Sequence, residues 1–189
     1  MKRPAVLVCA FTLLLAACAQ QDEVSPNGVS VPTPSPIPTP IAMELTSPAF
    51  THGGAIPSRY TCDGEDLSPP LRISGIPEGT QSLALICDDP DAPGNTWNHW
   101  ILFNIDPATT EITEGTEPPE SAGGTNSWRR IGYGGPCPPS GTHRYFFKLF
   151  ALDAPLPRFD DPPTKQELSS AMEGHILKQA ELMGVYQRQ

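Results

Sequence analysis

The chain has 189 residues and carries 12 Lys and Arg against 21 Asp and Glu, a formal net charge of −9. This acidic balance argues against a nucleic-acid-binding protein, because contacts with phosphates need clustered Lys and Arg. The 24 prolines and 16 glycines argue against a multi-helix bundle and indicate that part of the chain is turn or tether.

Residues 1–17 have the pattern of a signal peptide. Lys2 and Arg3 precede an apolar run at residues 6–15, which is too short to span a bilayer. The run ends in small residues before Cys18, which resembles the lipobox of bacterial lipoproteins and implies cleavage before Cys18 and lipidation of its sulfur. The sequence therefore predicts an exported protein that is lipid-anchored to the bacterial cell envelope. An ordinary secretory signal with an incidental Cys18 is the alternative.

Residues 18–42 are predicted to form a proline-rich tether. Proline occurs at every second position from Pro32 to Pro40, and this spacing removes backbone donors and excludes both helix and sheet interior. We expect an extended polyproline II stalk that lifts a domain off a membrane. A proline-rich ligand for a partner module is the alternative interpretation.

Residues 43–189 are predicted to form one mainly β domain. Short apolar or aromatic runs bounded by turn residues indicate strands, and they lie at residues 71–73, 82–87, 100–105 and 144–152. The long loops between them are unlike the turns of a simple meander. We expect a Greek-key β-sandwich of two antiparallel sheets, with a C-terminal helix packed against it.

The predicted helix begins with a capping box. Thr164 precedes Glu167 by three residues, which is the spacing at which the two side chains satisfy each other's backbone N–H groups. Apolar residues then recur at helical spacing from Leu168 to Met183, and Gly184 would end the helix.

The domain contains three cysteines, Cys62, Cys87 and Cys137. Export favours disulfides, but an odd number allows at most one bridge within the domain. The spacing does not decide which pair forms it. No CxxC motif occurs, which argues against a structural zinc site.

The candidate site residues lie at strand ends. Asp89 and Asp91 follow the apolar run that ends at Cys87, whereas His99 and His143 each precede a strand. Each aspartate alone could be a turn former, and each histidine alone could be structural. In an antiparallel sheet, however, the start of one strand lies beside the end of its neighbour, so these four side chains can share one rim.

A glycine-rich and proline-rich segment, residues 132–139, precedes His143. Its glycines permit close backbone approach, and successive N–H groups could form an anion-binding nest. Imidazoles, a nest and a tyrosine hydroxyl together suit phosphate or a similar oxyanion. Trp97 and Trp128 are expected to be loop aromatics near this rim.

Five motifs occur in order: DGEDLSPPL at 63–71, DPDAP at 89–93, HW at 99–100, GGP at 134–136 and HRY at 143–145. Together they resemble the phosphatidylethanolamine-binding protein family, in its bacterial Raf-kinase-inhibitor-like branch. The resemblance implies a β-sandwich with a small rim pocket for phosphate, acetate or a phosphoethanolamine head. Carried over by motif, the ligand-binding residues are Asp89, Asp91, His99, Trp100, Gly135, Pro136, His143 and Tyr145.

Three functions are compatible with these residues. The predicted function is binding of a small anion or phosphorylated headgroup, with no cofactor, metal or catalytic residue. Inhibition of a kinase or protease partner is the alternative. An enzyme would need two histidines and an aspartate on a metal, or Ser127 or Ser140 paired with His143. The sequence has neither a G-x-S-x-G elbow nor an H-E-x-x-H motif, which argues against these enzymes.

Overall fold

The computed structural model describes residues 42–188. The predicted signal peptide, Cys18 and almost all of the predicted tether lie outside the described residues. In the part of the chain that is described, no helix is both long enough and apolar enough to cross a membrane.

The larger sheet has five antiparallel strands in the order β6-β4-β3-β7-β8. Its strands are β3 (Ser82–Asp89), β4 (Trp97–Ile105), β6 (Ala122–Gly123), β7 (His143–Leu152) and β8 (Ile176–Tyr186). Strand β3 lies in the middle and is buried at every position. Strand β7 pairs with β3 and not with β6, so the sheet is not a simple meander.

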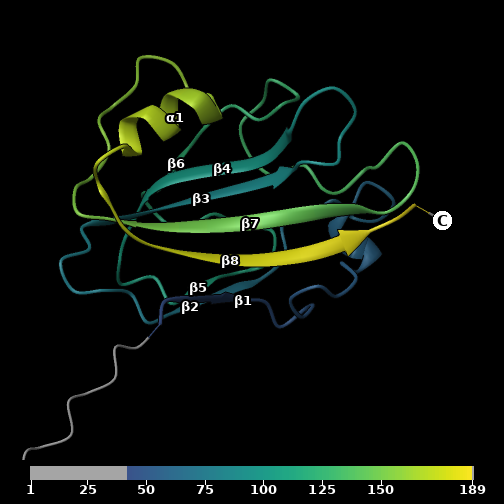
Figure 1. Cartoon of the computed structure of the whole chain (residues 1–189), viewed down its shortest axis with the longest axis horizontal. Helices are drawn as coiled ribbons and strands as arrows, with labels where there is room; N and C mark the ends of the chain where they lie inside the picture. Colours follow the sequence, from purple (N-terminus) through teal and green to yellow (C-terminus); the bar gives the residue numbers. More distant parts are fainter. Residues whose placement is uncertain (1–41, 189) are drawn as a thin grey trace, which may run out of the picture. The chain divides into compact units, whose positions relative to one another are not determined.

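The smaller sheet has three short antiparallel strands, β1 (Glu44–Thr46), β2 (Leu71–Ser74) and β5 (Glu111–Ile112), in the order β1-β2-β5. It lies across one face of the larger sheet (Figure 1). Side chains from both sheets form one buried core, among them Leu45 and Ile73 from the smaller sheet and Leu85, Trp100 and Phe147 from the larger one. The predicted mainly β fold with two antiparallel sheets is therefore confirmed.

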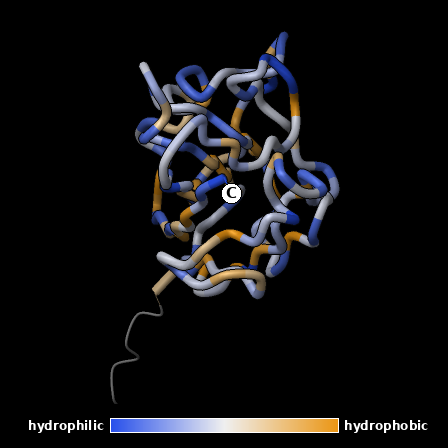
Figure 2. The backbone as a smooth tube through the Cα atoms, turned by 90° about the vertical axis from the view of Figure 1, so that its right-hand side faces the viewer, coloured by the Kyte–Doolittle hydropathy of each residue, from blue (hydrophilic) through white to orange (hydrophobic). Residues whose placement is uncertain are grey.

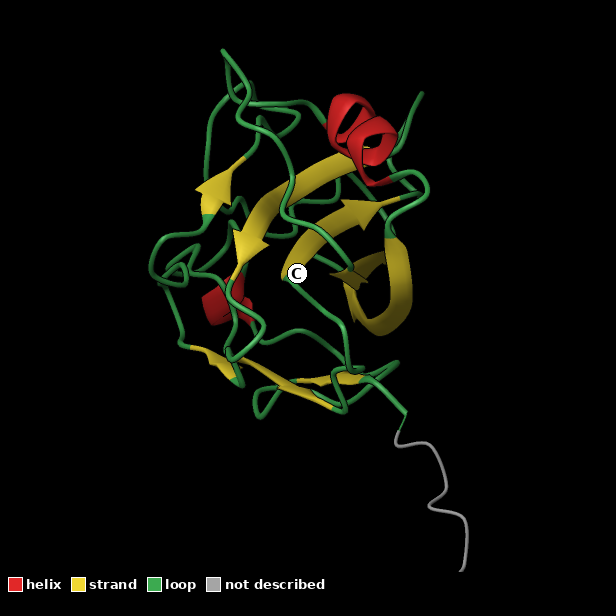
Figure 3. Cartoon of the chain, turned by 90° about the vertical axis from the view of Figure 1, so that its left-hand side faces the viewer, coloured by secondary structure: helices red, strands yellow, loops and turns green. Residues whose placement is uncertain are grey.

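A second core lies on the other face of the larger sheet. Helix α1 (Lys165–Met172) buries Leu168 and Met172 against Ala84, Ile86 and Ile101. Figure 3 shows α1 in red on the side of the larger sheet away from the smaller one. These two cores explain why β3 is apolar on both faces, and Figure 2 shows such hydrophobic stretches (orange) separated by hydrophilic loops (blue).

The predicted helix begins where expected but is much shorter than expected. Thr164 and Glu167 form the complete capping box, which confirms the start. The helix ends at Met172, Gly174 has a φ of 81°, and β8 follows and pairs with β7 along its whole length. The prediction of a helix continuing to residue 183 was wrong.

The physical reason lies in the pairing of β8. Without β8, β7 would be an unpaired edge with a row of exposed backbone groups. The spacing of apolar residues at 176–186 is also compatible with a strand, because Ala180, Leu182 and Tyr186 alternate into the core. Backbone pairing with β7 therefore decides between two patterns that the sequence leaves ambiguous. The last element that the structure describes is therefore the strand β8, which lies beside β7 in Figure 1.

Candidate functional site

A cavity of about 270 Å³ lies at the end of the larger sheet, where β3 ends and β4 and β7 begin. It is lined by Asp89, Ala92, Pro93, Trp97, His99, Trp128, Cys137, Pro139 and His143. The structure thus brings together one acid and two histidines that the sequence analysis placed at a common rim. Antiparallel pairing of β3 with both β4 and β7 is the reason.

Asp89 and His143 form a buried pair at this cavity. The carboxylate Oδ2 lies 2.7 Å from His143 Nδ1, and the two residues are 3% and 7% exposed. The second oxygen, Oδ1, accepts a hydrogen bond from the backbone N–H of Asp91 at 2.8 Å. The carboxylate is therefore held at both oxygens, and Nε2 is the ring nitrogen of His143 that remains for a ligand.

His99 is oriented by the backbone of the 132–139 segment. Its Nδ1 lies 2.6 Å from the carbonyl oxygen of Gly134, and because a carbonyl only accepts, Nδ1 carries the proton. Burial lowers the pKa of His99 from the ordinary 6.5, so the ring is neutral at pH 7 and its Nε2 is a hydrogen-bond acceptor. The ring packs edge-on against Trp128 and Tyr145, with centroids 5.1 and 5.2 Å away.

Tyr145 lies behind His99 with a hydroxyl that is not hydrogen-bonded. The residue is fully buried, and its hydroxyl has no hydrogen-bond partner among the described residues. Burial, with a smaller contribution from the charge of Asp89, raises the pKa of Tyr145. The hydroxyl therefore stays protonated and is a donor without a partner, and an unsatisfied buried group of this kind costs about 1–3 kcal/mol.

Asp91 does not line the cavity but is hydrogen-bonded to Arg144 beside it. Its carboxylate accepts hydrogen bonds from the backbone N–H, Nε and Nη2 of Arg144 at 2.9, 2.9 and 2.6 Å. These bonds lower the pKa of Asp91 to about 2. The interaction ties the loop after β3 to the start of β7, and it commits the carboxylate to Arg144.

Trp100 lies between the sheets and does not line the cavity. It is fully buried, its Nε1 donates to Glu117 at 3.2 Å, and its ring packs edge-on against Tyr133 at 5.6 Å. Adjacent residues of a strand point to opposite faces, so a strand that directs His99 into the cavity directs Trp100 away from it.

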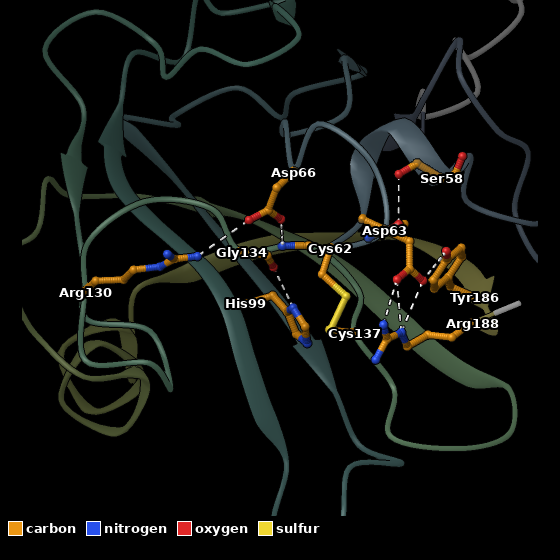
Figure 4. Close-up of a disulfide and its surroundings, with 12 residues drawn as sticks. Ser58, Cys62, Asp63, Asp66, His99, Arg130, Gly134, Cys137, Tyr186 and Arg188 are labelled. Atoms are coloured by element: carbon orange, nitrogen blue, oxygen red, sulfur yellow. Dashed lines mark hydrogen bonds and ion pairs between the residues drawn. A yellow bond between two sulfur atoms is a disulfide. The ribbon is translucent and has the colours of Figure 1, made fainter.

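Two backbone donors of the predicted anion-binding nest, those of Gly134 and Gly135, are used within the protein. The N–H of Gly134 donates to His99 O at 3.0 Å, and the N–H of Gly135 donates to Asp66 Oδ1 at 2.6 Å. Gly135 instead permits close packing, since a Cβ there would lie 2.6 Å from the carbonyl oxygen of Tyr60. Gly135 and Pro136 are both buried and do not line the cavity. They follow Gly134, whose carbonyl holds the His99 ring (Figure 4).

The disulfide joins Cys62 to Cys137, with an S–S distance of 2.06 Å, across 75 residues of sequence. Cys87 remains a buried free thiol, and burial raises its pKa. Cys137 lines the cavity, a role that spacing alone does not reveal. Trp97 and Trp128 form the aromatic part of the wall, with ring centroids 5.4 Å apart.

Asp88 and Asp89 are neighbours at the end of β3, but they contact different parts of the protein. It is buried next to Asp89, but its carboxylate binds Lys148 Nζ at 2.9 Å and also Lys165 Nζ, in the first turn of α1. Asp88 therefore anchors α1 to the larger sheet, whereas Asp89 serves the cavity.

The structure contains a larger hollow away from the two histidines. It has a volume of about 550 Å³ and lies beside β6 and residues 157–163, but its charged side chains, Glu120, Arg158, Asp160 and Asp161, are all exposed. Within residues 42–188, no group of three or more His, Cys, Asp or Glu side chains could hold a metal ion. Unlike that hollow, the cavity with the two histidines is lined by buried titratable side chains, Asp89, His99 and His143.

The chain is similar to proteins of known sequence along most of this domain. A protein of Methanothermobacter thermautotrophicus named UPF0098 protein is 52% identical over 151 residues, covering 77% of this chain and 99% of that protein. A UPF0098 protein of Chlamydia muridarum is 47% identical over 151 residues, with the same coverage.

Two solved structures have the same fold. A phosphatidylethanolamine-binding protein homolog from Chlamydia trachomatis superposes with a TM-score of 0.75 at 43% identity, covering 78% of this chain and 99% of that one. Escherichia coli YbcL, described as a new member of the mammalian PEBP family, superposes with a TM-score of 0.74 at 30% identity. The match covers 79% of this chain and 100% of that one.

A family model described as phosphatidylethanolamine-binding protein matches residues 46–187. That range includes all five motifs of the predicted resemblance and every residue that lines the cavity. The chain therefore belongs to the phosphatidylethanolamine-binding protein family.

Proposed function

We propose that the cavity binds a small anionic group, such as phosphate or the phosphate of a phosphoethanolamine-type headgroup. One observation supports this most strongly. His99 and His143, from different strands, line one cavity, and each has its Nδ1 committed to the protein. Their Nε2 atoms are the ring nitrogens that remain for a ligand.

The charges around the cavity favour an anionic ligand that still carries one proton on an oxygen. Among the described residues that line it there is no Lys or Arg. A protonated His143, compensated by Asp89, can donate a charge-assisted hydrogen bond to an anionic oxygen. Nε2 of neutral His99 can accept a hydrogen bond from a P–OH group, and the Tyr145 hydroxyl can donate to a third oxygen. A singly protonated phosphate offers both kinds of atom.

Titration calorimetry with inorganic phosphate and with phosphoethanolamine tests this proposal. His143→Ala is expected to weaken binding of both probes by at least about tenfold, as for loss of a hydrogen bond to a charged group. His175→Ala is the matched control, because His175 also pairs with an aspartate but is exposed. Unchanged binding by His143→Ala, or no binding by the unmodified protein, would contradict the proposal.

A phosphoserine peptide forms a further arm of the same experiment. Regulation of a kinase or protease partner, the alternative from the sequence analysis, would place a protein-borne anion in this cavity. Tighter binding of the peptide than of phosphoethanolamine would favour that alternative over a lipid headgroup.

We also propose that the protein is exported and lipid-anchored through Cys18. This part rests on the sequence of residues 1–18, and the proline-rich residues 18–42 suit a stalk between membrane and domain. Cell fractionation of Cys18→Ser tests it, since the variant is expected to leave the membrane fraction. Persistent membrane association of that variant would contradict the anchor.

A further inference from the structure

The disulfide lies where a solvent-borne reagent can reach it. Cys62 and Cys137 are both exposed, and Cys137 also lines the cavity. The bond connects the segment around Asp66 to the 132–139 segment (Figure 4). A disulfide at the wall of a binding cavity and open to solvent is accessible to a thiolate, which is the first requirement for exchange.

The two segments are also joined by hydrogen bonds that do not depend on the sulfur atoms. Cys62 N–H donates to Pro136 O at 3.1 Å, Gly135 N–H donates to Asp66 Oδ1 at 2.6 Å, and the Tyr133 hydroxyl donates to Tyr60 O at 2.9 Å. Opening the disulfide therefore leaves the segments paired, so the two cysteines stay close enough to be oxidised again.

The same segment orients a ligand-binding ring. Gly134, three residues before Cys137, supplies the carbonyl that holds His99 Nδ1, and Figure 4 shows this contact. Loss of the covalent link removes one restraint on the wall at Cys137, while the hydrogen bonds between the two segments keep them paired. Because the Gly134 carbonyl selects the tautomer of His99, a less restrained wall would hold Nε2 less strictly for one kind of contact.

We infer that Cys62–Cys137 is a redox-modification site, reduced in the folded protein by a dithiol, and that its oxidised state keeps the anion cavity in its binding form. This inference rests on the proposed function. The partner is a dithiol reductant, either a small molecule or the dithiol of an oxidoreductase.

A thiolate of the dithiol attacks one sulfur of the pair, a mixed disulfide forms, and the Cys62–Cys137 bond breaks with its electron pair on the departing cysteine. The second thiol of the reductant then displaces the remaining cysteine. The protein gains two electrons and two protons as two thiols, and the dithiol is oxidised to its disulfide.

Cys87 does not compete in this exchange. It is 1% exposed, and burial, together with the neighbouring charges of Asp88 and Asp89, raises the pKa of its thiol. Since the thiolate is the reactive form, Cys87 is a poor nucleophile, and reoxidation returns the Cys62–Cys137 pair.

The first measurement is thiol trapping on the full chain without denaturant. After treatment with dithiothreitol, alkylation and mass spectrometry are expected to show modified Cys62 and Cys137, with Cys87 modified only after denaturant is added. Protection of Cys62 and Cys137 until the protein unfolds would overturn the inference.

The second measurement compares inorganic phosphate binding by the oxidised and reduced proteins. Reduction is expected to weaken binding at least about fivefold, the lower end of typical coupling between sites, and reoxidation is expected to restore it. The double variant Cys62→Ser with Cys137→Ser should bind weakly with or without the reductant, whereas Cys87→Ala should keep the full response. Equal affinities of the oxidised and reduced proteins would overturn the coupling.

A ligand-free measurement separates failure of this inference from failure of the proposed function. The ring nitrogens of His99, observed by NMR, are expected to show one tautomer in the oxidised protein and a mixture after reduction. If oxidised protein binds no phosphate, the proposed function fails, and the His99 signals still decide whether the disulfide controls the cavity. Unchanged His99 signals on reduction would overturn the inference by themselves.

Discussion

Two histidine–aspartate pairs among residues 42–188 have nearly the same geometry and opposite surroundings. His143 Nδ1 lies 2.7 Å from Asp89, and the side chains are 9% and 5% exposed. His175 Nδ1 lies 2.8 Å from Asp153, and the side chains are 48% and 47% exposed. The first pair lines the cavity, whereas the second lies in the turn between α1 and β8 and beside the end of β7.

Burial, and not the pairing itself, makes the loss of one partner of a histidine–aspartate pair costly in free energy. Water screens the exposed pair and replaces either partner at little cost. Around the buried pair, removal of one partner leaves a polar group without compensation. Four predictions follow this difference from the largest expected effect to the smallest.

Asp89→Asn is expected to lower the free energy of unfolding by about 3 kcal/mol, because it breaks a buried pair and weakens the acceptor for the backbone N–H of Asp91. Asp153→Asn, the matched change in the exposed pair, should cost less than about 1 kcal/mol. Urea denaturation at pH 7 measures both. Equal losses in the two variants would mean that burial does not distinguish the pairs.

Tyr145→Phe extends the comparison to a buried group without a partner. Removing the unpaired hydroxyl should leave stability unchanged or raise it by up to about 1 kcal/mol, and it should weaken phosphate binding about fivefold, the effect of one hydrogen bond. Tyr133→Phe is the control, because that hydroxyl is already bonded to Tyr60 O. It should lose stability without losing phosphate affinity. Undiminished phosphate binding by Tyr145→Phe would exclude this hydroxyl from the site.

The pH dependence of stability should reveal the burial of His99. Burial lowers the pKa of His99 below 6.5, so the unfolded chain binds more protons than the folded one as the pH falls through 6.5. Stability is then complete above that pH and declines below it, by at most about 1.4 kcal/mol per pH unit.

His99→Asn keeps a donor for Gly134 O but does not titrate, so it should flatten this decline. His175→Asn should leave the decline as it is. Denaturation curves between pH 5 and 8 check both variants, and a decline that persists in His99→Asn would assign it to another group.

The smallest effect is expected at Asp91 and Arg144, where the Arg144 side chain is 52% exposed. Arg144→Ala should cost less than about 1 kcal/mol at pH 6. Because the pKa of Asp91 is lowered from 3.8 to about 2, this contribution is present above pH 3.8 and is lost as the pH falls toward 2. Denaturation at several acidic pH values should show the parent and variant converging, and a gap independent of pH would contradict the ion pair.

Long apolar strands were predictable from the sequence, but short ones were not. The runs at 82–87, 100–105 and 144–152 all lie within β3, β4 and β7. Strands β1, β5 and β6 have only three, two and two residues, which is too few for any period to show. At 176–186 helical and strand periods both fit, and pairing with β7 makes the choice.

The candidate site was predictable to the extent that strand ends determine it. Asp89, His99 and His143 meet because neighbouring antiparallel strands share an end. Trp100, assigned to the site by motif, does not line the cavity, as alternation along a strand would suggest. Only the folded chain shows that Asp66 and His99 already occupy two donors of the predicted nest.

The sequence by itself determined the strand-forming runs, the start of α1, the family motifs and the residues from which a site could be built, because these are encoded over a few neighbouring positions. Tertiary structure alone decided which of them act together. His143 and Asp89 are 54 residues apart and the bridged cysteines 75, and contact over such separations depends on which strands pair and how the loops pack. Burial, which makes one histidine–aspartate pair different from another, is a property of that packing.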